Sequence, residues 1–464
     1  MSNYRTPGVY IEEIPSFPPS VAQVETAIPA FIGYTEKGPG EPTRIGSMVD
    51  YRSVFGGPRN GIGTFTIAAN GTITSPSISP TPDYRLYYML EMFFANGGGD
   101  CYIISVGNYT DTISNTAMAD GLELLNKEDE PTLILFPDAA SPVNSDDHFD
   151  LYKAALAQCT DRKDRFLICD VDQSTNPVNT VRVSASDFRD NIGANDLLFG
   201  AAYFPNLKTT MSYQYAGNQI NVDNNGTALV LRHSDETIRE NPGQAAQSLF
   251  HADNGAHRST YFAIRKTIES VKLVLPPSAA IAGIYARTDS TRGVWKAPAN
   301  VSLNRVSAPS LLIDHKEQED LNVTSTGKSI NAIRSFKGKG VMVWGARTLA
   351  GNDNEWRYVP VRRFFNMVEE SVKNASEKFV FEPNDANTWM KVKAMIENYL
   401  ITLWRAGAMM GAKPEDAFFV KVGLGETMTP EDVLEGKMIV EIGMAVVRPA
   451  EFIILRFSHK MMES

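Results

Sequence analysis

Short apolar runs alternate with amphipathic stretches between residues 101 and 204. The apolar runs predict buried strands, and the polar stretches between them carry apolar residues at helical spacing, as in Phe149, Tyr152 and Leu156. This alternation is typical of a mostly parallel sheet covered by helices. The predicted strands are 101–106, 132–136, 165–171 and 199–203, and the predicted helices are 111–126, 146–160 and 184–192.

A further helix is predicted before the first of these strands. Leu86, Leu90 and Phe93 share one helical face, and the glycines at 97–99 follow them. Because glycine commonly ends helices, we expect the helix to stop there.

Two segments interrupt this pattern and are predicted to be surface insertions, near 60–82 and 204–257. Residues 60–82 are rich in Gly, Thr, Ser and Pro. In the second segment, Asn225-Gly226 stands between alternating apolar residues, which predicts a β-hairpin.

The second half of the chain contains two amphipathic helices. The first contains Val361, Phe364 and Val368, and the second begins near Asp385 and ends before Gly407. The glycines within 337–340 suggest a domain boundary before these helices. We therefore expect an arm and linker over 1–22, an outer doubly wound α/β domain over 23–340, an inner α+β domain over 341–436 and a second arm over 437–464.

Both chain ends carry strand-like residues that lack a local partner. The run Val9-Tyr10-Ile11 is separated from the rest by the proline-rich residues 15–19, which favour an extended linker. An unpaired strand is unstable by itself, so its backbone groups need the edge of another sheet. We expect strand exchange between copies of the chain. The predicted arm residues are Val9, Tyr10, Ile11, Met438, Val440, Ile442, Phe452, Ile454 and Phe457.

Composition narrows the range of functions. The 464 residues include 44 Lys and Arg and 54 Asp and Glu, a net charge of −10 without a basic block, so we expect no nucleic-acid partner. The three cysteines are too few for a disulfide framework. Residues 1–14 show no secretory signal and no apolar run is long enough to span a membrane, which favours synthesis in the cytoplasm without membrane insertion.

The sequence signals for catalytic and metal sites are weak. Residues 326–329 read Thr-Gly-Lys-Ser, but Asn322 stands where a phosphate-binding loop needs its first glycine. The six histidines have no metal-binding spacing. Asp138, Asp170 and Asp172 follow predicted strands at the carboxyl edge of the sheet, where they could hold magnesium or simply cap helices and turns.

Several segments together resemble one family. They are Tyr4-Arg-Thr-Pro-Gly-Val-Tyr-Ile-Glu-Glu13, Ala30-Phe-Ile-Gly-Tyr34, Phe93-Phe-Ala-Asn-Gly-Gly-Gly-Asp-Cys-Tyr102, Arg292-Gly-Val-Trp-Lys-Ala-Pro-Ala299, Val343-Trp-Gly-Ala-Arg-Thr-Leu349, Arg362-Arg363, Phe381-Glu-Pro-Asn384 and Pro449-Ala-Glu-Phe452. In this order they resemble the tail sheath subunits of contractile phages and phage-derived injection particles.

The resemblance implies a structural subunit of a helical sheath around an inner tube, which contracts to drive the tube through a target envelope. It implies arms that pair with neighbouring subunits, no cofactor and no catalytic residue. It also implies four partners: other copies of the chain, the inner tube protein, the baseplate and the terminal cap. The protein would be made in a bacterial cytoplasm and become part of a virion tail or phage-like particle.

Two other hypotheses remain open. The chain could be a minor sheath paralogue at the baseplate or cap end of the particle. Alternatively, it could be a magnesium-dependent phosphohydrolase that uses Asp138, Asp170 and Asp172, a hypothesis that predicts metal binding and turnover lost on Asp170→Asn.

Overall fold

The computed structural model describes residues 21–68, 71–141, 144, 148–174 and 179–454. The chain divides into two compact units. Unit 1 is Met1–Val24 with Met367–Val447, and unit 2 is Glu25–Asn366 with Arg448–Ser464. Near the glycines of 337–340, where the sequence suggests a boundary, residues 337–339 form a turn between two strands of unit 2. The two compact units divide after Asn366.

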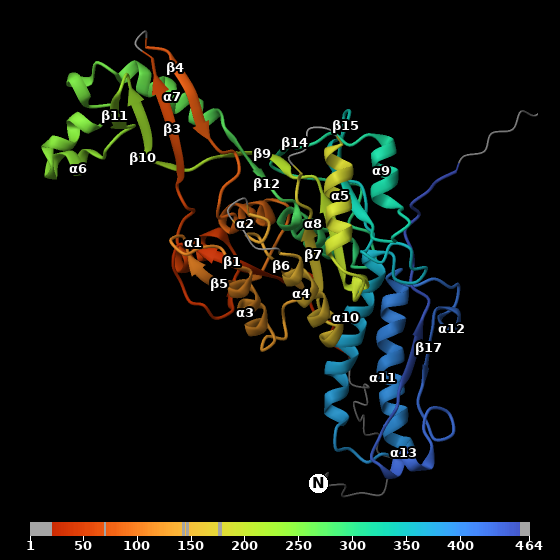
Figure 1. Cartoon of the computed structure of the whole chain (residues 1–464). Helices are drawn as coiled ribbons and strands as arrows, with labels where there is room; N and C mark the ends of the chain where they lie inside the picture. The colour runs from red at the N-terminus through yellow and green to blue at the C-terminus, as the bar shows by residue number, and fades with distance from the viewer. Residues whose placement is uncertain (1–20, 69–70, 142–143, 145–147, 175–178, 455–464) are drawn as a thin grey trace, which may run out of the picture. The chain divides into compact units, whose positions relative to one another are not determined.

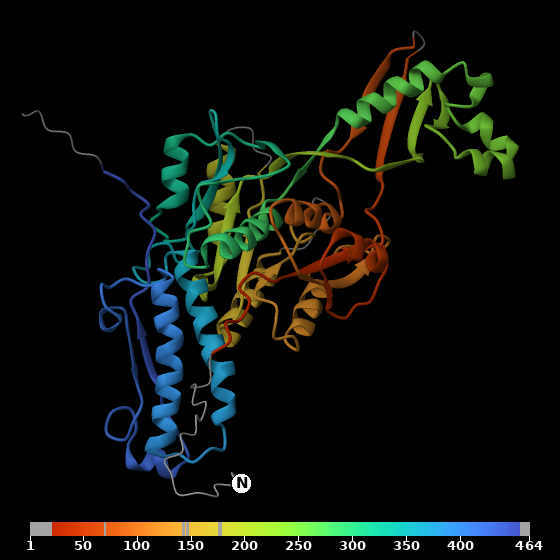
Figure 2. The same cartoon turned by 180° about the vertical axis from the view of Figure 1, so that it is seen from behind.

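A nine-stranded sheet forms the centre of unit 2 (Figures 1 and 2). Its six central strands are parallel, and short antiparallel strands lie at both edges. The mixed α/β fold class is thus confirmed. In spatial order the strands are β13 (Val301–Ser302), β16 (Gly340–Val343), β15 (Ile330–Phe336), β8 (Gly200–Phe204), β7 (Phe166–Asp170), β6 (Leu133–Leu135), β1 (Pro29–Thr35), β5 (Cys101–Asn108) and β2 (Thr43–Ile45).

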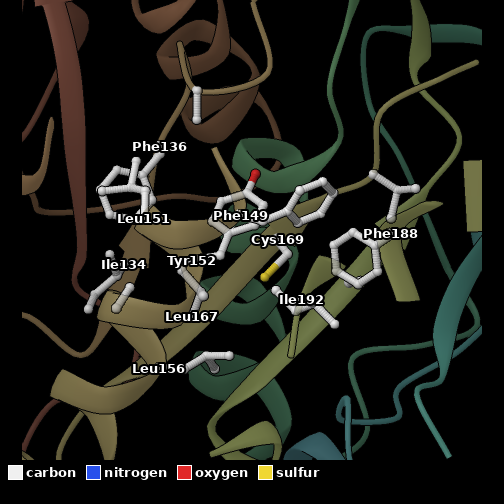
Figure 3. Close-up of a cluster of buried hydrophobic side chains, with 14 of the residues drawn as sticks. Ile134, Phe136, Phe149, Leu151, Tyr152, Leu156, Leu167, Cys169, Phe188 and Ile192 are labelled. Carbon is white, nitrogen blue, oxygen red and sulfur yellow. The ribbon is translucent and has the colours of Figure 1, made fainter. Parts of the chain in front are cut away.

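Helices cover both faces of this sheet. Alternate strand residues enter different cores: Leu167 and Cys169 of β7 pack in one, and Phe166 and Ile168 in the other. Figure 3 shows the first core, where Tyr152 and Leu156 approach Leu167 as their helical spacing predicts. The first core takes α3 (Asn115–Leu125), α4 (Phe149–Arg162) and α5 (Thr180–Asn191), and the second takes α2 (Leu86–Ala95) and α8 (Ser278–Arg292).

The two predicted insertions meet in one small module of unit 2 (Figure 1). β3 of the first pairs in parallel with β10 of the second, and Asn225-Gly226 makes the predicted hairpin turn. The module has its own core, centred on Phe65, Val222 and Ile264. Its elements are β3 (Gly61–Ile67), β4 (Ile73–Ile78), β10 (Tyr215–Asn224), β11 (Thr227–Val230), α6 (Asp235–Glu240), η2 (Pro242–Gln247), η3 (Ala252–Gly255) and α7 (Arg258–Ser270).

A three-stranded sheet and three short helices complete unit 2. The sheet has the order β12–β9–β14. These elements are β9 (Leu207–Ser212), β12 (Lys272–Leu275), β14 (Val306–Pro309), α1 (Met48–Phe55), η1 (Leu197–Phe199) and α9 (His315–Asn322).

Unit 1 is built from two long helices and a small sheet. The first helix, α10, begins in unit 2, and its residues from Met367 onward belong to unit 1. Asp385 caps α11 by accepting a hydrogen bond from the Thr388 backbone N–H, as the sequence predicts. The elements are α10 (Val359–Ser376), η4 (Glu377–Phe379), α11 (Ala386–Arg405), α12 (Pro414–Ala417), β17 (Phe418–Lys421), α13 (Pro430–Leu434) and β18 (Glu441–Met444). No helix within the described residues has both the length and the apolar character needed to cross a membrane.

Candidate functional site

A buried arginine fixes the chain near its described N-terminal end. Arg363 donates hydrogen bonds to both carboxylate oxygens of Asp289 and, at 2.8 Å, to the carbonyl oxygen of Thr26. The Thr26 hydroxyl donates to Asp289 Oδ2 at 2.7 Å. Because the Arg363 and Asp289 side chains are only 3% and 7% exposed, solvent screens the pair weakly. We call Thr26, Asp289 and Arg363 the N-terminal anchor.

A second buried arginine fixes the chain near its described C-terminal end. Arg347 donates two hydrogen bonds to the carboxylate of Glu451. Nε lies 3.0 Å from Oε1, and Nη2 lies 2.6 Å from Oε2. Asn322 Nδ2 donates to Oε1 at 2.7 Å, and the Tyr358 hydroxyl donates to Oε2 at 3.2 Å. We call Asn322, Arg347, Tyr358 and Glu451 the C-terminal anchor; all four belong to unit 2.

The electrostatics of the C-terminal anchor favour an ionised Glu451. Partial burial by itself raises the pKa of this carboxyl, but the hydrogen bonds from Arg347 and Asn322 outweigh it and hold the pKa below its usual value. Charge-assisted, two-pronged Arg–carboxylate bonds of this kind are among the stronger hydrogen bonds in proteins.

The small sheet of unit 1 is the second candidate feature. β17 and β18 pair antiparallel over four residues each, with Val420 opposite Ile442. Among the described residues, neither strand is joined to a third strand. An isolated pair of strands is only marginally stable in water, and its unpaired edge groups can accept another strand. This sheet is therefore a candidate acceptor for a strand from another chain.

Unit 1 also exposes many large apolar side chains. Phe381 is fully exposed, and Leu434 is 88% exposed. Single exposed apolar side chains are common on protein surfaces, whereas a contiguous apolar patch marks a contact site. The exposed large apolar residues of unit 1 are Val380, Phe381, Met390, Met410, Phe419, Leu424, Leu434 and Ile439.

The predicted arm residues fall into different environments. Ile442 lies in β18, paired with the chain's own Val420, while Met438 and Val440 are half-buried just before that strand. Phe452 and Ile454 follow the C-terminal anchor and are 69% and 78% exposed. Four predicted arm residues lie outside the described part of the chain: Val9, Tyr10, Ile11 and Phe457. Strand exchange between copies stays a prediction.

The structure assigns two of the three candidate catalytic carboxylates to helix N-termini. Asp138 accepts hydrogen bonds from the backbone N–H groups of Arg85, at 2.6 Å, and Tyr34, at 2.8 Å. Asp170 accepts from the backbone and hydroxyl of Ser278, at 2.8 and 2.6 Å. Arg85 and Ser278 stand at the starts of α2 and α8, so both carboxylates tie strand ends to helices, the alternative role that the sequence left open.

The third carboxylate, Asp172, is not assigned to a helix N-terminus. Its carboxylate oxygen Oδ2 lies 3.7 Å from His148 Nδ1. The described residues contain no group of three His, Cys, Asp or Glu side chains close enough together to hold a metal ion. The magnesium-dependent alternative therefore has no geometric support in the described part of the chain.

Burial changes the titration of the two helix-capping carboxylates. Loss of water raises the pKa of Asp138 to about 6, against the opposing hydrogen bonds from Arg85 and Tyr34. It raises the pKa of Asp170 to about 7, against the opposing bonds from Ser278. Both groups thus hold a proton more tightly in the folded chain than in the unfolded one.

Sequence reasoning does not identify the anchors. Arg347 and Glu451 both lie in segments that carry the family resemblance, and Arg363 lies in a third. The sequence gives no sign, however, that residues 104 positions apart form an ion pair.

Comparison with protein-family models gives two matches. Residues 150–349 match the model described as the phage tail sheath protein central domain. Residues 351–460 match the model described as the phage tail sheath C-terminal domain. Together the two matches cover most of the chain after residue 150.

Solved structures match over nearly the whole chain. A chain of the anti-feeding prophage baseplate is 34% identical with a TM-score of 0.65, covering 99% of this chain and 100% of that one. A chain of the anti-feeding prophage helical sheath in its contracted state is 33% identical with a TM-score of 0.66, covering 98% and 100%. A chain of the contracted PVC sheath complex, an extracellular contractile injection system, is 31% identical with a TM-score of 0.66, covering 99% of both.

Curated relatives match over shorter stretches. The tail sheath protein of Vibrio phage KVP40 is 25% identical over 39% of this chain and 26% of its own length. The tail sheath protein of Enterobacteria phage T4 is 26% identical over 33% of this chain and 22% of its own length. The matched region thus spans about a quarter of these two relatives.

Proposed function

The chain belongs to the contractile tail sheath family, and from this premise we propose that it is the repeating subunit of a contractile sheath. In this proposal copies polymerise helically around an inner tube. The assembled wall then shortens and drives the tube through a target envelope. The subunit would be made in a bacterial cytoplasm and carried in a phage tail or phage-like particle.

One observation carries the proposal: the sheet formed by β17 and β18 has no third strand among the described residues. In unit 2 the large sheet ends in β2 and β13, strands of three and two residues, which offer little edge to a neighbour. The other sheets of unit 2 end in β4, β11, β12 and β14, but each has at least three strands, whereas the β17–β18 sheet has two among the described residues. We therefore propose the small sheet of unit 1 as the acceptor for strands from other copies.

The arms supply the strands in this mechanism. The N-terminal run around Val9, Tyr10 and Ile11 and the C-terminal run from Phe452 through Ile454 to Phe457 would each extend a neighbour's β17–β18 sheet. On the accepting subunit, the incoming strands would lie next to β18, which contains Ile442, and next to the preceding residues Met438 and Val440. Each backbone hydrogen bond contributes about 0.5–1.5 kcal/mol, and a helical wall repeats the contact in every subunit.

Continuity through the arms lets the wall rearrange without coming apart. Other interfaces can be exchanged during contraction while strand pairing keeps neighbouring copies joined. This mechanism uses protein contacts alone and assigns the chain no catalytic role, which is consistent with Asp138 and Asp170 serving as helix caps.

The expected partners follow from the same arrangement. They are other copies of the chain, the inner tube protein, and the baseplate and cap proteins at the two ends. We expect the tube to be contacted by polar side chains of unit 1, around residues 413–416. Lys413, Glu415 and Asp416 are exposed there.

Electron microscopy of the purified chain tests the proposal. Wild-type protein should form hollow striated cylinders, whereas a chain lacking residues 1–14 should stay folded but form none. A double substitution, Val9→Asp with Ile11→Asp, should have the same effect because charges at a strand edge oppose pairing. Val49→Asp is the matched control, since Val49 is 72% exposed in unit 2 and should tolerate the charge. Normal contractile particles built from the truncated chain would refute the proposal.

A second candidate function is favoured by the baseplate match. The anti-feeding prophage baseplate chain is as similar to this chain as the helical sheath chain is, at 34% and 33% identity. A minor sheath paralogue next to the baseplate would therefore share these features. Copy number along a purified particle separates the two: a main subunit repeats along the full length, and a paralogue is confined to one end.

A further inference from the structure

The turn between α10 and α11 holds an aromatic residue in a backbone conformation that favours glycine. The Glu382 backbone N–H donates to the Phe379 carbonyl oxygen at 3.1 Å. Val380, at φ −65° and ψ 130°, and Phe381, at φ +69°, are the central residues of this type II turn. Glycine or asparagine is usual at the second central position, because a Cβ atom disfavours positive φ. Among the described residues with positive φ, Phe381 is the only aromatic one.

Both central side chains of this turn are exposed. Val380 is 61% exposed and Phe381 fully so, and the ring therefore gains no packing within the subunit that would offset its unfavourable backbone. The turn is held in place from behind: Asn384 Nδ2 donates to the Lys437 carbonyl oxygen at 2.9 Å, and Trp389 Nε1 donates to Asn384 Oδ1 at 2.7 Å. Figure 1 shows the turn at the end of unit 1 that also carries α13. A large ring held out on a fixed, unfavourable turn is typical of an interface anchor.

The surroundings of the ring are acidic. Glu377 and Glu382 are exposed and form no ion pair within the described residues. The one basic residue of 377–385 is Lys378, whose ammonium lies 5.6 Å from the centre of the Phe379 ring. A partner for this surface should be apolar at its centre and basic around it. We call Glu377, Val380, Phe381 and Glu382 the acidic tip.

The turn between β15 and β16 in unit 2 has this complementary character. Residues 334–344 contain Arg334, Lys337 and Lys339 and no acidic residue. Trp344 is 37% exposed, and the centre of its ring lies 4.4 Å from that of Phe336. The Arg334 guanidinium lies 5.6 Å from the centre of the Phe336 ring. Lys337 and Lys339 are exposed and form no ion pair in the described part of the chain. We call these five residues the basic ledge.

The acidic residues of α9, which packs beside β15, have partners of their own. Glu317 accepts a hydrogen bond from the Asp314 backbone N–H at 2.9 Å. Asp320 Oδ2 accepts from Arg189 at 3.2 Å. The cations of the basic ledge are thus left to an acidic partner from outside the subunit.

We propose that the acidic tip of one copy docks on the basic ledge of another copy, with Phe381 packed against the Phe336 and Trp344 rings. This inference rests on the proposed function. A helical relative, the anti-feeding prophage sheath, supports a partner of the same sequence. A helical assembly joins two different surfaces of one chain, and the tip and the ledge differ in shape and are opposite in charge. The contact is separate from strand pairing by the chain ends.

Phe381→Gly separates an interface role from a structural one. Glycine suits this position of a type II turn, so the monomer should unfold at about the wild-type urea concentration. The protein concentration needed for cylinders to sediment should rise about tenfold or more, as is typical when an aromatic anchor is truncated. Lys163→Gly is the matched control, because Lys163 is an exposed residue at φ +61° after α4 and belongs to neither surface. It should leave assembly unchanged.

An exchange of charges tests whether the two surfaces meet. Glu377→Lys with Glu382→Lys makes the tip basic, and Lys337→Glu with Lys339→Glu makes the ledge acidic. Either pair by itself places like charges opposite one another and should raise the concentration needed for assembly. All four substitutions in one chain restore opposite charges and should bring that concentration back to within about threefold of the wild-type value.

Three results would count against these ideas. Wild-type assembly by Phe381→Gly, or a fourfold variant that assembles no better than either pair, would overturn the inference. Phe381→Gly cylinders that form normally but bind the inner tube protein more weakly would assign the tip to the tube and overturn it as well. Wild-type protein that forms no cylinders would instead overturn the proposed function on which the inference rests.

Discussion

The ring of Phe419 in β17 lies across Gly443 of β18. The two residues are directly paired in the antiparallel register. A Cβ atom added at Gly443 would stand 2.2 Å from ring carbon Cε1, closer than two carbon atoms can approach. The glycine therefore allows the ring to cover the partner strand, and the pair shapes the sheet that we propose accepts strands from other copies.

Gly443→Ala should weaken this sheet. The new methyl group forces the half-exposed Phe419 ring away, a steric change that typically costs about 1–3 kcal/mol. We expect faster backbone hydrogen exchange in residues 418–421 and fewer assembled cylinders. Gly423→Ala is the control within unit 1, because a Cβ there makes only an ordinary 3.6 Å contact with Glu426. Equal behaviour of the two variants would contradict the role given to the Phe419–Gly443 contact.

Asp289→Ala should destabilise the monomer strongly. It leaves Arg363, which is 3% exposed, without its countercharge, and removal of one partner of a buried pair typically costs about 3–5 kcal/mol. Urea unfolding of the monomer measures the loss. Asp100→Ala removes an Arg–Asp pair whose side chains are 49% and 47% exposed, with Arg44 as the partner, and should cost about 0–1 kcal/mol. If Asp289→Ala lowers the free energy of unfolding by only about 0–1 kcal/mol, as expected for an exposed pair, the result would argue against a stabilising role of the N-terminal anchor.

The stability of unit 2 should fall as the pH rises through the acid range. Burial raises the folded-state pKa of Asp170 to about 7. Between the unfolded value of about 4 and that value, the folded chain keeps a proton that the unfolded chain has lost. The contribution of Asp170 to the free energy of unfolding is fully present below about pH 4. It is lost as the pH rises toward 7, at up to about 1.4 kcal/mol per pH unit.

Asp170→Asn removes this titration and keeps the hydrogen-bonding shape. The free energy of unfolding should therefore depend less steeply on pH between 5 and 6.5 in the variant than in the wild type. Asp150→Asn serves as the control, since its side chain is 84% exposed. Parallel pH profiles for wild type and Asp170→Asn would show that Asp170 titrates normally in the folded chain.

The insertion module should unfold separately from the large sheet. Ile264 is fully buried in the module's own core, and an Ile→Ala change in a core costs about 2–5 kcal/mol. We expect Ile264→Ala to speed hydrogen exchange in β3, β10 and α7 only. Ile104→Ala, in the core beside the large sheet, should speed exchange in β1 and β5 instead. If each substitution speeds hydrogen exchange equally in the insertion module and in the large sheet, the two cores unfold together.

The sequence predicts those elements whose pattern is local. Helical spacing predicts α4 from Phe149, Tyr152 and Leu156. The pair Asn225-Gly226 predicts the turn between β10 and β11. β1 is not predicted as a strand, although all seven of its residues are buried, because Pro29 and Gly33 both have low strand propensity. Local patterns thus predict four of the six central parallel strands, β5, β6, β7 and β8, and miss β1.

Long-range pairing accounts for what the sequence does not reveal. β3 and β10 lie in insertions separated by most of the parallel sheet, and nothing in either strand identifies its partner. The same holds for Arg347 and Glu451, whose contact joins residues 104 positions apart. The sequence does place Asp138 and Asp170 at strand ends, but only the structure shows which backbone groups they bind.

A cryo-electron microscopy map of the assembled chain, at a resolution that separates strands, tests the central claim most directly. We predict that the β17–β18 sheet gains strands from other copies, one from residues near Tyr10 and one from residues beyond Ile454. A sheet that remains two-stranded in the assembly, with both chain ends folded onto their own subunit, would contradict the account.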